Sequence, residues 1–180
     1  MRKMHKYLAV LFVVSGLAAL GMIQDAEGPQ IRQVASFWYV CMDFADSMDM
    51  QKAERYFQEL RSQGLAGKAQ GDLFRVLDNY PGLETSAMRT WGLAYRIDEG
   101  TSVSPPLRVR RFDYPRAVVI VHPGPFEMAH VALNEVVAFV EEKGLLIAGP
   151  PLEVWIGNPA SDKPEDLKTE IIVPVREEGA

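Results

Sequence analysis

Apolar and polar residues in the second half of the chain follow a pattern that predicts three strands and one helix. Residues 107–122 and 152–156 are rich in β-branched and aromatic side chains, and residues 168–175 read K-T-E-I-I-V-P-V, as expected for strands, the first of them bent at Pro115. Within residues 129–140 apolar side chains recur at steps of three and four, which predicts an amphipathic helix ending at Gly144. The predicted order is strand, helix, strand, strand.

The first half of the chain repeats this order. Residues 31–44 predict a strand, residues 50–60 a helix, and residues 73–77 and 89–97 two further strands. Three pairs of landmarks suggest a duplication, with offsets of 80, 79 and 79 residues: Gly64 with Gly144, Asn79 with Asn158, and Thr90 with Thr169.

The duplication predicts the fold class. We expect an α+β domain of two β-α-β-β units, residues 31–100 and 107–177, that form an antiparallel sheet. The helices should cover one face of the sheet, and a ligand cleft should lie between the two halves.

Glu170 is a carboxylate in a segment that otherwise suits a buried strand. Because side chains alternate along a strand, Glu170 shares one face with Ile172 and Pro174. An ionised carboxylate buried there without a partner would be strongly destabilising. Either water or a nearby Lys or Arg satisfies Glu170, or the carboxylate binds a ligand.

The alignment of the two repeats gives Trp91 the same position as Glu170. Trp91 and Tyr95 would then line one wall of the predicted cleft, and Glu170 and Ile172 the other. Ordinary core packing is the alternative for either aromatic residue alone. Since aromatic faces attract cations, the joint placement predicts a site for a flat, apolar, positively charged ligand.

The first 28 residues differ in composition from the rest of the chain. Arg2, Lys3 and Lys6 precede an uncharged apolar run over residues 7–23. That order is typical of an export signal, and the run is also near the shortest length that spans a bilayer. We expect residues 1–28 to be a signal peptide or an N-terminal transmembrane anchor. Residues 29–180 would then form a domain in the cell envelope, either membrane-anchored or periplasmic or otherwise extracytoplasmic.

The overall composition excludes some functions. A net charge of −5 argues against a nucleic-acid partner, because phosphate contacts are made by clustered Lys and Arg. Cys41 is the single cysteine, so the chain has no internal disulfide. Its apolar surroundings predict a buried, inert thiol.

Three motifs of the second half together resemble the GyrI-like small-molecule-binding domain. They are H-P-G-P-F-E at 122–127, L-E-V-W-I-G-N-P at 152–159 and T-E-I-I-V-P-V at 169–175. This family is the effector-binding domain that is also attached to bacterial transcription activators of the AraC and MerR types. The resemblance covers residues 107–177, and over residues 31–100 it rests on the order of elements alone.

The resemblance implies a ligand held in a central cleft, often a hydrophobic cation, by aromatic residues and an acidic residue. The family's acid in the last strand corresponds to Glu170. Trp155 and Phe126 stand where the family commonly has Tyr, so two phenol hydroxyls are missing here.

The leading hypothesis is a non-enzymatic domain that binds an apolar, cationic small molecule and uses no cofactor or metal. A second hypothesis is a hydrolase of reactive small molecules, with Glu170 as the base and Tyr95 or Tyr39 assisting. A third hypothesis is haem binding, because the SOUL type of haem-binding domain resembles the same duplicated fold. The candidate ligands would be His122 and His130, the only histidines of the domain. A fourth is a membrane-tethered adaptor that binds another protein.

Overall fold

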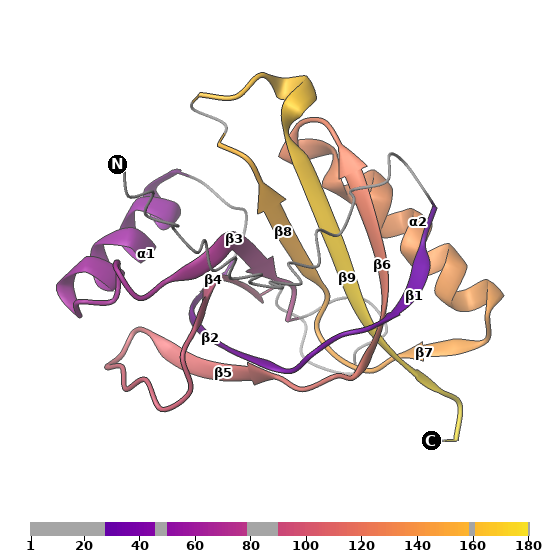
Figure 1. Cartoon of the computed structure of the whole chain (residues 1–180), viewed down its shortest axis with the longest axis horizontal. Helices are drawn as coiled ribbons and strands as arrows, with labels where there is room; N and C mark the ends of the chain where they lie inside the picture. The colour runs from indigo at the N-terminus through magenta and orange to yellow at the C-terminus, as the bar shows by residue number, and fades with distance from the viewer. Residues whose placement is uncertain (1–27, 46–49, 79–89, 159–160, 180) are drawn as a thin grey trace, which may run out of the picture.

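The computed structural model describes residues 28–45, 50–78, 90–158 and 161–179. Within them the chain forms nine strands, two α-helices and two short 3-10 helices (Figure 1). In chain order they are β1 (Gln30–Gln33), β2 (Phe37–Ala45), α1 (Met50–Ser62), β3 (Gln70–Val76), β4 (Thr90–Ile97), β5 (Arg108–Phe112), β6 (Arg116–Pro123), η1 (Phe126–Met128), α2 (Ala129–Glu142), β7 (Leu145–Ile147), β8 (Leu152–Ile156), η2 (Pro164–Asp166) and β9 (Lys168–Glu177).

All strand pairs are antiparallel and form one sheet in the order β1-β6-β9-β8-β3-β4-β2-β5, with β7 also paired to β9. The first repeat is β2-α1-β3-β4 and the second is β6-α2-β8-β9. Their central strands, β3 and β8, pair with each other, so that the two repeats join into a continuous sheet. The predicted duplication and the α+β fold class are confirmed.

The outermost strands are exchanged between the repeats. β1 precedes the first repeat in the chain but pairs with β6 of the second, whereas β5 precedes the second repeat but pairs with β2 of the first. Residues 31–44 were predicted as one strand, which is wrong, and residues 107–122 as one strand bent at Pro115, where the structure has a full break. Each segment must leave one repeat and cross to the other, so it breaks into two strands, at residues 34–36 and 113–115.

Both helices lie on the same face of the sheet, as predicted. Cross-strand partners connect Leu93 under α1 through Arg75, Glu153 and Ile171 to Ile120 under α2. Since direct partners point to the same side of a sheet, this row runs beneath both helices. In Figure 1, α1 and α2 lie toward opposite ends of the sheet.

Three packed clusters stabilise the fold. One lies under α2, where Val136 and Ile171 are fully buried, and one under α1, where Tyr56 donates a hydrogen bond to the Val40 carbonyl oxygen at 3.0 Å. Each fully buried aliphatic side chain contributes about 1.5–3 kcal/mol. The third cluster fills the face without helices and draws residues from both repeats: Tyr39, Cys41, Phe74, Val76, Ala94, Phe112, Ala117, Val119, Leu152 and Ile172.

Residues 1–27, to which the predicted export signal or anchor belongs, lie outside the described residues. Among the described residues, neither helix has the length and apolar character that a membrane crossing requires.

Candidate ligand-binding site

The six residues predicted to bind ligand are divided between the two faces of the sheet. Glu170 and Ile172 lie on the face without helices, where Ile172 is buried in the packed cluster that both repeats share. The four aromatic residues lie on the helix face: Trp91, Tyr95, Phe126 and Trp155.

The predicted placement of Trp91 and Tyr95 opposite Glu170 is wrong. Trp91 is 5% exposed, stacks on Phe44 with ring centroids 4.9 Å apart, and packs with Tyr95 in the cluster under α1. The sequence landmarks matched residues of the two repeats that are 79 positions apart, an odd number. In the sheet, Arg75 of the first repeat pairs with Glu153 of the second, which is 78 positions away, an even number. Because strand side chains alternate, an error of one residue exchanges the two faces.

Glu170 lies between Val121 of β6 and Val154 of β8 and is half-buried. Burial raises the pKa of its carboxyl group above the ordinary value, and the positive charges of Arg32 and Arg96 partly oppose this. Arg96 itself lies over the Phe37 ring at 4.2 Å. The carboxylate that was predicted to await a cationic ligand thus lies in the field of two positively charged side chains, which offset only part of the effect of burial.

The acid that shares a face with the aromatic residues is Glu153 on β8. It is only 2% exposed, and Arg75 Nε donates a hydrogen bond to its Oε2 at 2.7 Å. Burial raises the pKa of Glu153, while the Arg75 guanidinium and then His130 act in the opposite direction.

Sequence reasoning missed Glu153 although its signal was present. In L-E-V-W-I the acid stands in a strand of apolar residues, and alternation puts it on the same face as Trp155. The same argument selected Glu170. Its partner Arg75 is 78 residues away in the sequence, and no local pattern connects the two.

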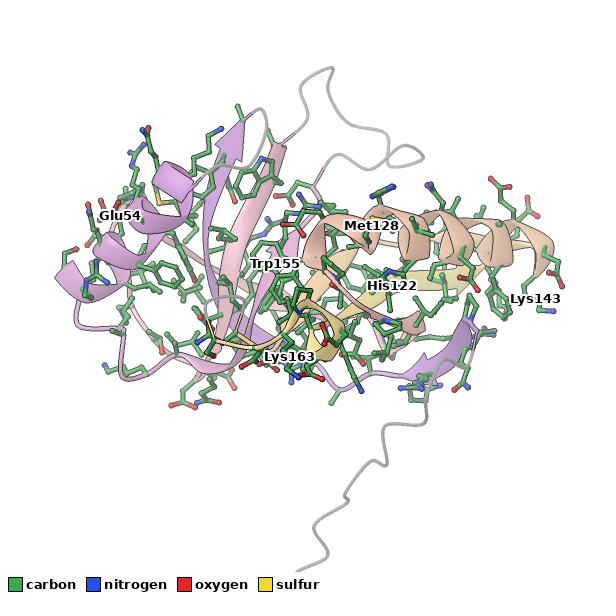
Figure 2. The ribbon with its side chains drawn as sticks, turned by 90° about the horizontal axis from the view of Figure 1, so that it is seen from above. Glu54, His122, Met128, Lys143, Trp155 and Lys163 are labelled. Atoms are coloured by element: carbon green, nitrogen blue, oxygen red, sulfur yellow. The ribbon has the colours of Figure 1, made fainter. Side chains whose placement is uncertain are left out.

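Trp155 lies between α1 and α2 in Figure 2. The Phe126 ring, carried on η1 just before α2, stacks on the Trp155 indole with centroids 5.7 Å apart and an interplanar angle of 17°. Both rings are half-buried, and Trp155 also packs against the cluster under α1. The two predicted aromatic residues of the second repeat are therefore brought together.

The cross-strand partner of Trp155 is Thr169 of β9, which is fully buried. Within the described part of the chain, neither Trp155 Nε1 nor Thr169 Oγ1 has a hydrogen-bond partner, although both atoms are buried. Buried polar groups of proteins usually have such partners, so these two mark an unusual point on the helix face.

The remaining candidates are placed elsewhere. His122 is the other cross-strand neighbour of Thr169, and His130 Nδ1 lies 2.9 Å from the Glu127 carbonyl oxygen. In the described ranges, no group of three or more His, Cys, Asp or Glu side chains is arranged to hold a metal ion. Cys41 is buried, and burial raises the pKa of its thiol despite the nearby Arg110.

Of the two tyrosines proposed to assist Glu170, Tyr39 shares its face of the sheet and Tyr95 does not. Tyr95 lies on the opposite face of the sheet. Tyr39 shares the face of Glu170, but it is 4% exposed, packs against Phe74 at 5.5 Å, and burial raises the pKa of its phenol.

The fold places this chain among α+β domains built from a duplicated β-α-β-β unit. The model of one such family, the GyrI-like small molecule binding domain, matches residues 29–176, and the chain belongs to this family. No curated protein sequence matches the chain.

Several solved structures share the fold. The C-terminal domain of EcmrR has a TM-score of 0.65 and 17% identity, over 83% of this chain and 97% of that domain. The chain spans 57% of the longer EcmrR chain in its complex with DNA. SAV2435 bound to tetraphenylphosphonium has a TM-score of 0.56 and 16% identity, over 83% of this chain and 94% of that one.

A protein from Listeria innocua described as a hydrolase has a TM-score of 0.55 and 19% identity, over 83% of this chain and 92% of that one. At identities of 16–19%, these similarities show the fold alone.

Proposed function

We propose that the domain binds an apolar organic cation on the helix face, against the stacked rings of Phe126 and Trp155. The observation that carries the proposal is a carboxylate, Glu153, buried on the same strand and the same face as the half-buried Trp155 ring, on which Phe126 stacks. Glu153 and Trp155 are two residues apart, so their side chains stand roughly 7 Å apart along β8.

Two interactions favour a cation at this position. The faces of aromatic rings attract cations by about 0.5–2 kcal/mol, depending on desolvation. Arg75, which pairs with Glu153, is 28% exposed and can turn its guanidinium group to water. A bound cation would then replace Arg75 as the partner of a carboxylate that has no access to solvent.

A relative provides a suitable probe. SAV2435 has been solved with tetraphenylphosphonium, which is an apolar organic cation. Isothermal titration of this chain with tetraphenylphosphonium should show saturable binding. Trp155→Ala should weaken the affinity roughly tenfold, as expected for the loss of about 1.4 kcal/mol of ring contact.

Two carboxylate variants test the position of the counter-charge. Glu153→Gln should weaken tetraphenylphosphonium binding, whereas Glu170→Gln, a matched change on the opposite face, should leave it within about twofold, a difference of only ~0.4 kcal/mol. Far-UV circular dichroism of each variant checks that the fold is retained. If Glu170→Gln alone weakened binding, the ligand would belong to the other face of the sheet.

A hydrolase is the second candidate, because burial raises the pKa of Glu153 and a carboxylate with a raised pKa is a stronger general base. A similarly folded Listeria protein is described as a hydrolase. Turnover of electrophilic substrates such as epoxides and activated esters by the parent, lost in Glu153→Gln, would support it over binding alone.

We further propose that the domain acts in the cell envelope. The basic start and the apolar run of residues 7–23 support an export signal or a membrane anchor. Fractionation of cells that produce the full chain, followed by mass measurement of the purified protein, would distinguish cleavage from anchoring. Recovery of the intact chain in the cytoplasmic fraction would contradict this proposal.

A further inference from the structure

Two buried polar atoms on the helix face have no hydrogen-bond partner within the described residues, and they belong to neighbouring side chains. Trp155 Nε1 and Thr169 Oγ1 come from the directly paired residues of β8 and β9. Cβ atoms of such a pair are about 4.5–5.5 Å apart and point to the same side of the sheet. Both groups can therefore donate hydrogen bonds into the same region.

These donors lie beneath the aromatic stack of the proposed binding site. Phe126 covers the Trp155 indole, and none of the three residues of η1, which carries Phe126, is buried. Displacement of Phe126 by a ligand ring would leave the ligand stacked on the indole, with its edge toward Nε1 and Thr169. The strand below stays in place because Ile171 and Val173 of β9 are fully buried.

The chemistry of the two donors restricts what they can bind. An indole N–H is a donor only, whereas a threonine hydroxyl both donates and accepts. A carbonyl oxygen has two lone pairs and can accept one hydrogen bond from each group. A carboxylate or phosphate ligand is disfavoured, because Glu153 lies two residues from Trp155 on the same face.

We propose that the cation bound at this site carries a neutral hydrogen-bond acceptor, a ketone- or amide-type oxygen, that accepts from Trp155 Nε1–H and Thr169 Oγ1–H. Trp155 and Thr169 are then residues that determine specificity, and the ligand class narrows to aromatic cations with a carbonyl group at the ring edge. This inference rests on the proposed function, since it concerns the same site.

A matched pair of probes tests it. The cations 3-acetyl-1-methylquinolinium and 3-isopropenyl-1-methylquinolinium have the same charge and nearly the same shape, and only the first has an acceptor oxygen. Titration calorimetry on the full domain should show about three- to tenfold tighter binding of the acetyl probe, as expected for one or two net hydrogen bonds.

Two variants assign the preference to the two donors. Trp155→Phe keeps an aromatic ring but removes the N–H, and Thr169→Val keeps the shape but removes the hydroxyl. Each should lower the ratio of the affinity for the acetyl probe to the affinity for the isopropenyl probe, and the double variant should bring this ratio close to one, whatever the change in overall affinity.

The outcomes separate this inference from the proposed function. Equal binding of both probes to the parent would overturn the acceptor inference and leave cation binding intact. A preference that persists in the double variant would also overturn it, because the acceptor would then be recognised elsewhere. Failure of both probes to bind would overturn the proposed function and the inference together.

Discussion

Glu153, which is buried, and Glu170, which is half-buried, lie on adjacent strands and face opposite sides of the same sheet. Burial raises the pKa of both, but they differ in what compensates the charge. Arg75 contacts Glu153 directly, whereas Arg32 and Arg96 act on Glu170 through space. Glu153 therefore holds a fixed partner that a ligand would have to replace.

The raised pKa of Glu170 predicts a pH-dependent effect of removing its charge. A carboxyl group with a higher pKa in the folded than in the unfolded state contributes stability below its unfolded pKa, and this is lost as pH rises through the folded pKa. Glu170→Gln should therefore become more stable relative to the parent as pH rises from about 4 to 7. Urea unfolding of both proteins across this range measures the difference.

The pKa of Asp162 is shifted in the direction opposite to that of Glu170. Its carboxylate accepts hydrogen bonds from the Asn158 backbone N–H and the Ser161 hydroxyl, and these lower its pKa. The contribution of the Asp162 carboxylate to the stability of the fold is present above its unfolded pKa and is lost as pH falls. Asp162→Asn should therefore become less stable relative to the parent as pH rises. The same slope for both variants would contradict these assignments.

Thr169 also predicts a change in stability. A buried hydroxyl without a partner destabilises the folded state, so Thr169→Val should raise the free energy of unfolding by about 1 kcal/mol in the absence of ligand. Thr101→Val is the control, because the Thr101 hydroxyl donates to the Asp98 carbonyl oxygen at 2.7 Å and its loss should destabilise the protein. Chemical unfolding at one pH measures both effects.

The connections between elements depend on a close contact between Tyr114 and Gly149. Tyr114 lies between β5 and β6, and Gly149 lies between β7 and β8. A Cβ atom at position 149 would overlap the Tyr114 ring. The absence of a side chain at Gly149 allows the segment that joins β5 to β6 to pack on the second repeat.

Gly149→Ala should therefore destabilise the domain by about 1–3 kcal/mol, the usual range for overpacking. Gly67→Ala is the matched control, since a Cβ there meets no atom within 4 Å, and it should be neutral or slightly stabilising. Urea midpoints of the two variants measure the difference. Equal midpoints would show that Tyr114 moves aside at little cost.

The sequence predicted which residues form helices and strands better than it predicted the face of the sheet on which each strand side chain lies. Helix and strand periodicity identified both repeats, and motifs of the second half indicated the family. The side chains of β4 were matched to those of β9 by the spacing of Gly, Asn and Thr in the two repeats. A turn that is one residue longer or shorter changes this spacing without changing the fold. For this reason Trp91 was assigned to the wrong face, whereas Trp155 and Phe126, assigned from motifs, lie together.

The breaks in the two long strand segments depend on contacts far away in the sequence. β1 ends because its partner is β6, and β5 lies next to β2, more than sixty residues earlier. Pro115 marks the second break in the sequence, but no local pattern in residues 31–44 or 107–122 indicates that the two parts of a segment pair with different repeats. The same holds for the pairing of Arg75 with Glu153.

At the scale of the whole molecule, the exchanged strands join the repeats into one cooperative unit. β5 covers the edge of β2 and β1 covers the edge of β6, while β3 and β8 pair at the centre. An isolated second repeat, residues 107–179, would lack β1 and expose one side of β8. It should fail to fold cooperatively, as judged by far-UV circular dichroism and a broad urea transition.

The intact domain should instead unfold in a single transition. Trp38 and Trp91 report on the first repeat and Trp155 on the second, so tryptophan fluorescence and far-UV circular dichroism should give coincident curves. Separate transitions would mean that each repeat is stable alone, which would contradict the role assigned to the exchanged strands.

The exchanged strands also have a consequence for synthesis on the ribosome. When the first hundred residues have emerged, the edge of β2 is still uncovered, because its neighbour β5 ends at residue 112. β1, although it is made early, has no neighbour until β6 follows. The nascent first copy therefore keeps an unpaired strand edge until the second copy is translated, and neither copy can complete its part of the sheet alone.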